Sequence, residues 1–455
     1  MKKFPEYQNF NLSDINKSVL AEWEENDVFH QSIDTREGAP SFVFYEGPPS
    51  ANGMPGIHHV MSRTIKDIFC RYKTMQGFQV KRKAGWDTHG LPVELSVEKS
   101  LGITKEDIGV KISVAEYNAA CRREVMKYTK EWETLTRLMG YWVDMEHPYI
   151  TYDNKYIETL WYLLKQLYNK GLLYKGYTIQ PYSPAAGTGL SSHELNQPGC
   201  YRDVKDTTCV AQFKAKNAEN TYFLAWTTTP WTLPSNTALC VGEKIDYVKV
   251  KTQNPYTKEE VYLILAEALL EKVLGKNEYE IIEKYKGADL VGLEYEQLIP
   301  WFKPVGDNAF RVISGDYVTT EDGTGIVHIA PTFGADDAKV AKNFGIPPIL
   351  LTDKNGNQRP AVDLQGRFFR LEDLDADFVK TNVNVDLYKD WAGRFVKQEY
   401  SETETEDLNV DICVMLKQQG LAYKVEKHTH NYPHCWRTDK PVLYYPLDSW
   451  FIKTT

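Results

Sequence analysis

The chain has 455 residues, of which 42% are hydrophobic and 25% are charged, a composition typical of folded globular proteins. This composition excludes a disordered, collagen-like or coiled-coil chain, and the length predicts about three structural units. The 53 Lys and Arg residues against 62 Asp and Glu residues give a net charge of −9. Composition alone therefore does not indicate a nucleic-acid partner, although a local basic face remains compatible with it.

The cysteines and the N-terminus indicate the cellular compartment. The seven cysteines are scattered without any Cys-x-x-Cys pair, which favours reduced thiols over a disulfide framework. The N-terminal segment lacks the apolar core of a signal peptide, and no apolar run approaches the roughly 20 residues of a membrane span. We therefore expect a soluble, cytoplasmic protein that does not associate with membranes.

The first 90 residues alternate between helix and strand patterns. A helix is predicted over residues 13–29, with Ser13 as its N-cap. A buried strand is predicted over 41–45, a helix over 58–75 and a second strand over 78–84, with a glycine-rich loop after each strand. This order begins a parallel α/β unit, whose ligands bind at the carboxyl ends of the strands.

Two longer helices follow before the pattern changes. A capping box at Ser113 and Glu116 opens a helix that reaches about residue 139, and helical apolar spacing recurs from 157 to 168. Short strands separated by turns then dominate, until a helix over 408–419 and a strand over 423–426 return. We predict α/β segments at 1–198 and 396–455, interrupted by a β-rich domain at 199–395.

A loop of glycines and prolines, Glu46 to Gly53, precedes the stretch Gly56-Ile-His-His59. Glycine lets a ligand approach the backbone closely, and a helix N-terminus favours phosphate groups. The helix that follows is rich in Lys and Arg. A simple turn with capping histidines beside a solvated basic helix explains these residues equally well.

The run from Phe44 to Glu94 resembles the N-terminal nucleotide fold of class I aminoacyl-tRNA synthetases. Its Gly85-Trp-Asp-Thr-His-Gly-Leu-Pro92 segment is similar to the isoleucyl members in particular, and the resemblance covers essentially the whole chain. It implies a Rossmann-like class I fold, incomplete here, with an inserted β-rich editing domain. It also implies activation of isoleucine by ATP with Mg²⁺ and transfer of the isoleucyl group to tRNA(Ile).

The resemblance assigns roles to individual residues. Pro48 and Asp87 would hold the amino acid, with Asp87 paired to its ammonium group, and Gly56, Ile57, His58 and His59 would form the ATP motif. The family usually has His-Ile-Gly-His, so this chain lacks the first histidine and carries His58 where glycine is usual. We hypothesise that His58 supplies the missing phosphate donor.

Two segments of the β-rich region carry groups suited to hydrolysis. The first segment has four hydroxyls around a proline break, those of Thr227, Thr228, Thr229 and Thr232. The second segment follows a glycine turn and has the imidazole of His328 and the carboxylate of Asp337. Such groups can position water and hold an ammonium group without a metal, although a threonine-rich strand alone is usually structural. The resemblance implies that they form an editing site for valine on tRNA, with Asp337 recognising the amino group.

The chemistry of the two amino acids explains a second site. Valine lacks one methylene of isoleucine, and an apolar pocket discriminates only weakly against a missing methylene. A second pocket that is too small for isoleucine can remove valine after the first site has accepted it. The expected activity is therefore both a ligase and an aminoacyl-tRNA deacylase.

A cluster of histidines near the C-terminus, His428, His430 and His434 with Cys435, is a candidate zinc site. Many relatives carry Cys-x-x-Cys pairs here and near Pro181, and this chain lacks them. Tetrahedral zinc sites require four well-spaced ligands, so we expect a structural histidine cluster without zinc and no other metal site.

The family's Lys-Met-Ser-Lys-Ser loop and anticodon-binding domain are not found in the sequence. We therefore expect half of an aminoacylation site and a complete editing domain. We also expect the protein to be a monomer. Two alternatives remain, a free-standing editing hydrolase that acts in trans and a noncatalytic tRNA-binding module. The net negative charge argues against the binding module, because phosphate contacts need concentrated Lys and Arg.

Overall fold

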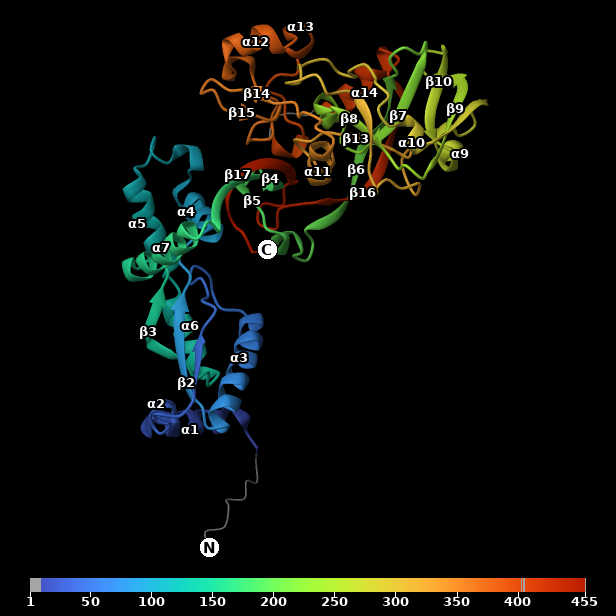
Figure 1. The fold of residues 1–455 in the computed structure, drawn as a ribbon. Helices are drawn as coiled ribbons and strands as arrows, with labels where there is room; N and C mark the ends of the chain where they lie inside the picture. The colour runs from blue at the N-terminus through green and yellow to red at the C-terminus, as the bar shows by residue number, and fades with distance from the viewer. Residues whose placement is uncertain (1–9, 402, 404–405, 455) are drawn as a thin grey trace. The chain divides into compact units, whose positions relative to one another are not determined.

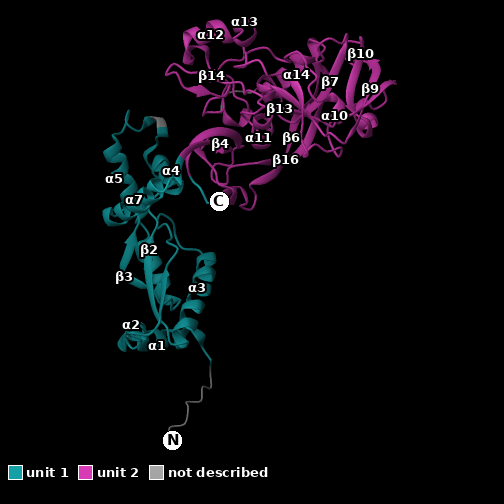
Figure 2. Ribbon diagram, viewed as in Figure 1, with its two compact units in different colours: residues 1–174, 452–455 teal, residues 175–451 magenta. Residues whose placement is uncertain are grey.

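The computed structural model describes residues 10–401, 403 and 406–454. The chain divides into two compact units (Figure 2), unit 1 with residues 1–174 and 452–455 and unit 2 with residues 175–451. None of the helices in the described ranges combines the length and the apolar character needed to cross a bilayer.

Unit 1 is built on a parallel sheet of three strands in the order β1-β2-β3 (Figure 1). The strands are β1 (Ser41–Tyr45), β2 (Gln79–Trp86) and β3 (Asp144–Ile150), and α3 (Ile57–Met75) connects the first two. The predicted parallel α/β fold is thus confirmed. The expectation that residues 41–45 are buried is wrong, because β1 pairs on one side only and leaves Val43 and Tyr45 exposed.

The other helical elements of unit 1 are α1 (Leu12–Glu25), α2 (Val28–Asp34), α4 (Leu91–Leu101), η1 (Lys105–Asp107), α5 (Val114–Val125), α6 (Thr129–Leu138) and α7 (Asn154–Asn169). The helix predicted over 13–29 is two helices, because Asp27 adopts a left-handed backbone with φ of 47°. The N-cap of α1 is Asn11 and not Ser13 as predicted, and the Asn11 side chain accepts a hydrogen bond from the Ser13 amide. The capping box of Ser113 and Glu116 forms as predicted, but its helix ends at Val125.

Unit 2 contains the predicted β-rich region. Its largest sheet has six strands in the order β11-β9-β10-β7-β6-β16. In chain order these are β6 (Tyr201–Lys214), β7 (Thr221–Thr227), β9 (Asp246–Gln253), β10 (Glu260–Ala266), β11 (Glu280–Lys286) and β16 (Ala422–Pro433). A smaller sheet has the order β12-β8-β13, formed by β8 (Ala238–Val241), β12 (Arg311–Ser314) and β13 (Ile326–Ile329).

The remaining elements complete the fold. The remaining strands are β4 (Leu173–Ser183), β5 (Thr188–Gly189), β14 (Leu351–Thr352), β15 (Gln358–Arg359) and β17 (Leu443–Ile452). The α-helices are α8 (Ser192–Leu195), α9 (Leu270–Leu274), α10 (Gly287–Leu290), α11 (Ala335–Asn343), α12 (Ala376–Asn382), α13 (Val385–Tyr388) and α14 (Leu408–Gln418). The 3₁₀ turns are η2 (Pro230–Ser235), η3 (Glu267–Leu269), η4 (Leu371–Asp373) and η5 (Gln398–Tyr400).

Candidate functional site

A cavity of about 430 Å³ opens in unit 1 beside the loop that follows β1. The loop contributes Glu46 to Ser50 and Asn52 to Met54, α3 contributes His59, Ser62, Arg63 and Lys66, and α6 contributes Trp132. Pro48 therefore lines the same cavity as His59. The carboxyl end of a strand and the first turns of a helix meet here, as the parallel fold predicts.

The buried carboxylate of Glu46 organises this cavity. It accepts a hydrogen bond from Lys66 Nζ at 2.5 Å and another from the Tyr141 hydroxyl, and Arg63 Nε lies 3.8 Å away. Burial lowers the pKa of Arg63, which the Glu46 charge opposes. Sequence reasoning gave Glu46 no role, although an acidic residue between a strand and a glycine-rich loop is a usable signal.

The basic stretch that follows is not a fully solvated face. Arg63 and Arg82 are buried, and Arg82 Nη1 lies 3.2 Å from Asp67 Oδ1. Arg71 Nε contacts the other oxygen of Asp67 at 2.6 Å. The Arg82–Asp67 pair therefore joins β2 to α3. The alternative of a solvated basic stretch is wrong for the buried Arg63 and Arg82.

The Gly56–His59 segment begins α3, with Gly56 as the N-cap. The Gly56 amide donates to His59 Nδ1 at 2.9 Å, so His59 carries its proton on Nε2, where it can still donate. Burial lowers the pKa of His59, as do the nearby His58 and Arg63. The exposed His58 ring folds over Gly56, and a Cβ placed on Gly56 would lie 2.7 Å from His58 Cε1.

Asp87 and the proline loop are brought together at the end of β2. The Asp87 amide donates to the carbonyl of Pro49 at 3.0 Å, next to Pro48. The Asp87 carboxylate accepts a longer hydrogen bond from the His89 amide at 3.4 Å. The two residues predicted to hold the amino acid therefore lie on neighbouring segments of unit 1.

Unit 2 brings together the threonine-rich segment and the strand that carries His328. Thr227 ends β7, and its hydroxyl oxygen accepts from the Thr229 amide at 3.1 Å. Thr232 lies in η2, and its hydroxyl oxygen lies 3.0 Å from His328 Nε2 on β13. Among the described residues, no hydrogen bond joins the half-buried Thr228 to this group.

The hydrogen bonds define the protonation state of His328. The Thr232 hydroxyl donates to the Thr229 carbonyl at 2.8 Å, so it accepts from His328, which must carry its proton on Nε2. Burial lowers the pKa of His328 to about 4, and the ring is therefore neutral at physiological pH. Its Nδ1 is buried and has no hydrogen-bond partner among the described residues, which leaves a lone pair available to a further donor.

Asp337 lies in the first turn of α11 and faces the end of β13. Its Oδ2 accepts from the Ala330 amide at 2.8 Å, two residues after His328. Burial raises the pKa of Asp337 to about 6. The sequence segments that contain the predicted threonines, His328 and Asp337 thus meet around one end of β13.

Of the C-terminal histidines, His428 and His430 lie on β16 and His434 follows just after its end. The His428 and His430 ring centroids lie 6.4 Å apart, and His430 Nε2 is 3.0 Å from Asp206 Oδ2 on the adjacent β6. His434 Nδ1 lies 3.0 Å from the Tyr432 carbonyl oxygen. In the part of the chain that the structure describes, no group of three or more His, Cys, Asp or Glu side chains is arranged to hold a metal ion.

Comparison with known proteins shows the family of the chain. The family model for class I tRNA synthetases (I, L, M and V) matches residues 18–455. An isoleucine–tRNA ligase of Bacteroides fragilis is 69% identical and aligns with all of this chain and 42% of its own length. The isoleucine–tRNA ligases of Bacteroides thetaiotaomicron and Porphyromonas gingivalis are each 65% identical, again across the whole chain and over 43% and 42% of their lengths.

The chain thus spans about two fifths of the length of the curated relatives it matches. The family model covers nearly all of the chain, including both the parallel sheet of unit 1 and the β-rich unit 2. The resemblance inferred from the sequence motifs is confirmed: the chain belongs to the class I tRNA synthetases of the I, L, M and V group.

Proposed function

We propose that this chain is part of an isoleucine–tRNA ligase, with residues of an aminoacylation site in unit 1 and an editing site in unit 2. The names of the relatives at 65–69% identity support the ligase assignment. We assign residues 199–395 to the editing domain and 1–198 and 396–455 to the catalytic domain; of the latter, 175–198 and 396–451 lie in unit 2 with the editing segments. The observation that carries the editing proposal is the hydrogen bond between Thr232 and His328, with Asp337 held by the Ala330 amide two residues further along the chain.

In the editing step, water attacks the ester carbonyl that joins valine to the terminal ribose of tRNA. The carbon–oxygen bond to the ribose breaks, the ribose oxygen takes a proton, and free valine and tRNA leave. Thr232 engages the Nε2 proton of His328 and fixes the orientation of the ring, whose buried Nδ1 keeps its lone pair. Asp337 keeps Oδ1 for the ammonium group of valine, while Oδ2 is held by the Ala330 amide.

The other predicted editing residues support the same step. Thr227 and Thr229 fix the turn that leads into η2, and we assign the half-buried Thr228 hydroxyl to the terminal ribose. No metal is required, because a hydroxyl, an imidazole and a carboxylate together provide orientation and charge complementarity.

In unit 1 we assign ATP, as its magnesium complex, to the cavity at the start of α3. The His59 Nε2 proton and the helix N-terminus can both contact phosphate. The His58 ring lies where a side chain on residue 56 would begin, which supports the hypothesis that His58 replaces the histidine missing from position 56. Pro48 and Asp87 are assigned to isoleucine, with the Asp87 carboxylate paired to its ammonium group.

Deacylation of Val-tRNA(Ile) and Ile-tRNA(Ile) by the 455-residue chain tests the editing proposal. We expect release of valine but not isoleucine, and we expect Asp337→Asn to slow this release at least tenfold. The exposed Asp377, which lies in α12 of the same unit, provides the matched control Asp377→Asn.

The outcomes separate the alternatives. Equal rates for Asp337→Asn and the wild-type chain would contradict the assigned site, and tRNA binding without hydrolysis would favour the noncatalytic module. Full editing rates without any partner chain would favour a free-standing hydrolase.

A further inference from the structure

Asn409 lies in the first turn of α14, 178 residues beyond the threonine-rich segment, yet it is bonded to that segment. We propose that Asn409 is a positioning residue that holds η2 in the conformation needed for editing. This inference rests on the editing function proposed for unit 2. Asn409 does not touch the reacting groups in this arrangement, and it acts through the backbone of its neighbours.

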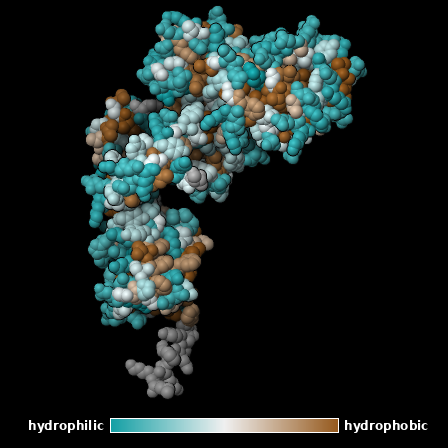
Figure 3. All heavy atoms as spheres, viewed as in Figure 1, coloured by the Kyte–Doolittle hydropathy of each residue, from teal (hydrophilic) through white to brown (hydrophobic). Residues whose placement is uncertain are grey.

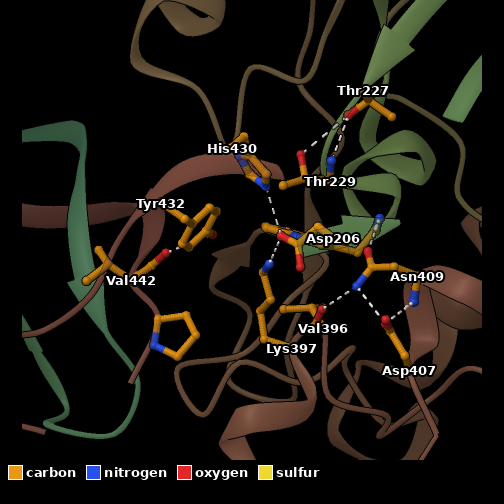
Figure 4. A network of polar contacts seen from close by, with 12 residues as sticks. Asp206, Thr227, Thr229, Val396, Lys397, Asp407, Asn409, His430, Tyr432 and Val442 are labelled. Carbon is orange, nitrogen blue, oxygen red and sulfur yellow. Dashed lines mark hydrogen bonds and ion pairs between the residues drawn. The ribbon is translucent and has the colours of Figure 1, made fainter. Parts of the chain in front are cut away.

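The side chain of Asn409 is 7% exposed and fully engaged (Figure 4). Its Oδ1 accepts from the Trp231 amide at 3.1 Å. Its Nδ2 donates to the Val396 carbonyl at 3.0 Å and to Asp407 Oδ1 at 3.1 Å. A buried amide with all of these bonds made has one orientation, so the Trp231 backbone is held in one place.

The peptide segment that Asn409 contacts is itself fixed. Lys397, the residue after Val396, is 5% exposed, and its Nζ lies 2.6 Å from Asp206 Oδ2. His430 Nε2 lies 3.0 Å from the same oxygen, so the Lys397 segment is tied to both β6 and β16 (Figure 4). Lys397 and His430 hold the pKa of Asp206 below its usual range, against the effect of burial. Asn409 therefore connects η2 to a rigid part of the main sheet.

Thr232 immediately follows Trp231, so the hydrogen bond between the Trp231 amide and Asn409 also positions the Thr232 side chain for the proposed editing step. The Thr232 hydroxyl must meet the Thr229 carbonyl at 2.8 Å and His328 Nε2 at 3.0 Å simultaneously. A displacement of the Trp231 backbone would lengthen one of these bonds and release the His328 ring. Misplacement of catalytic groups by about 1 Å can slow a reaction by about a hundredfold.

The chain offers a matched control for the substitution of Asn409. Asn254, at the end of β9, is 1% exposed and also makes bonds through both side-chain atoms. Its Nδ2 donates to Gln212 Oε1 at 2.9 Å and to the Ala422 carbonyl at 3.0 Å, and its Oδ1 accepts from the Tyr256 amide at 2.8 Å. Asn254→Ala removes a comparable buried amide without touching η2.

Two measurements on the 455-residue chain, with Asn409→Ala and Asn254→Ala, test the proposal. Hydrogen–deuterium exchange resolved to residues 229–236 should be at least tenfold faster in Asn409→Ala only. In deacylation of Val-tRNA(Ile), kcat should fall about tenfold or more in Asn409→Ala with KM nearly unchanged. In Asn254→Ala both values should stay close to those of the wild-type chain, whatever its melting temperature.

The two measurements separate this inference from the proposed function. Wild-type protection of residues 229–236 in Asn409→Ala overturns the positioning role, even if no variant hydrolyses tRNA. Faster exchange together with an unchanged kcat also overturns it, because Asn409 would then be structural only. A wild-type chain that does not deacylate Val-tRNA(Ile) contradicts the editing function, while the exchange result still decides whether Asn409 orders η2.

Discussion

The two units bury their apolar side chains very differently. In unit 2 one continuous core joins the six-stranded sheet to α14 and includes Trp301, Leu263 and Leu416. In unit 1 the buried apolar clusters are small, such as the group of Ala51, Trp86 and Trp132. Figure 3 shows apolar side chains on the surface of unit 1, where α3 exposes a row of them: Ile57, Met61, Ile65, Ile68, Phe69, Tyr72 and Met75.

This difference indicates what stabilises each unit. Unit 2 draws its stability from apolar burial, whose contribution rises with buried area. Unit 1 depends more on buried ion pairs, in which Glu46 and Asp67 engage cations from α3 and β2. Unit 2 should therefore resist unfolding more strongly, and substitutions of equal size should have unequal effects in the two units.

The largest expected effect comes from truncating the core of unit 2. Leu263 on β10 is fully buried, so Leu263→Ala should lower the free energy of unfolding of unit 2 by about 4 kcal/mol. Ile65 on α3 is 57% exposed, and Ile65→Ala should change the stability of unit 1 by less than about 0.5 kcal/mol. Denaturant unfolding followed by segment-resolved hydrogen exchange measures each unit separately.

Similar losses for the two substitutions would contradict this comparison. A large loss for Ile65→Ala would mean that the apolar face of α3 is covered in solution. A small loss for Leu263→Ala would mean that the core of unit 2 tolerates a cavity at β10.

The sequence predicted the features that depend on local pattern. The β1–α3–β2 order, the capping box at Ser113 and the β-rich character of unit 2 follow from apolar spacing and turn residues. The glycine and threonine motifs indicated the segments of both candidate sites. Within each segment the groups lie close together in the chain, whereas Thr232 and His328 are 96 residues apart and only the fold brings them together.

Features set by tertiary pairing were not predictable in this way. The edge position of β1 depends on strand order, and the burial of Arg63 and Arg82 depends on Glu46 and Asp67. The bond from Asn409 to Trp231 joins residues far apart in the chain. Nothing in the local pattern around Asn409 distinguishes it from an ordinary residue of a helix N-terminus.

The next largest loss of stability is expected from removing the buried carboxylate of Glu46 in unit 1. Glu46→Gln leaves Arg63 without its nearby carboxylate and Lys66 without its 2.5 Å partner. Breaking a buried ion pair on one side costs about 3 kcal/mol or more, so unit 1 should unfold at clearly lower denaturant concentration while unit 2 is unchanged. Glu94→Gln, at an exposed ion pair of the same unit, is the control. If Glu46→Gln and Glu94→Gln shift unit 1 equally, buried charge does not stabilise it.

His328 and Asp337 should make the stability of unit 2 respond to pH in opposite directions. The folded pKa of His328, about 4, lies below its ordinary 6.5, so acidification from pH 6.5 destabilises the fold. The folded pKa of Asp337, about 6, lies above its ordinary 3.8, so acidification below pH 6 stabilises it. These contributions offset each other in the wild-type chain.

Asp337→Asn removes the stabilising contribution alone. Between pH 7 and pH 4.5 this variant should lose about 2 kcal/mol more unfolding free energy in unit 2 than the wild-type chain does. The exposed-site variant Asp377→Asn should follow the wild-type curve. Parallel curves for Asp337→Asn and the wild-type chain would show that Asp337 titrates normally, and that burial does not raise its pKa.

The smallest expected effect tests the contact between His58 and Gly56 in unit 1. A Cβ on Gly56 would lie 2.7 Å from His58 Cε1, so Gly56→Ala must displace the ring. Because His58 is exposed, the ring can rotate into solvent, and the loss of stability should stay below about 1 kcal/mol. The NMR signal of the His58 ring should nevertheless shift clearly, and in a double-mutant cycle His58→Ala should remove the cost of Gly56→Ala.

An unmoved ring signal would place His58 away from Gly56 in solution, and His58 could then not stand in for the missing histidine. A shifted signal with little loss of stability would locate the imidazole beside Gly56 at the start of α3, the place we propose for ATP, independently of any measurement of adenylate formation.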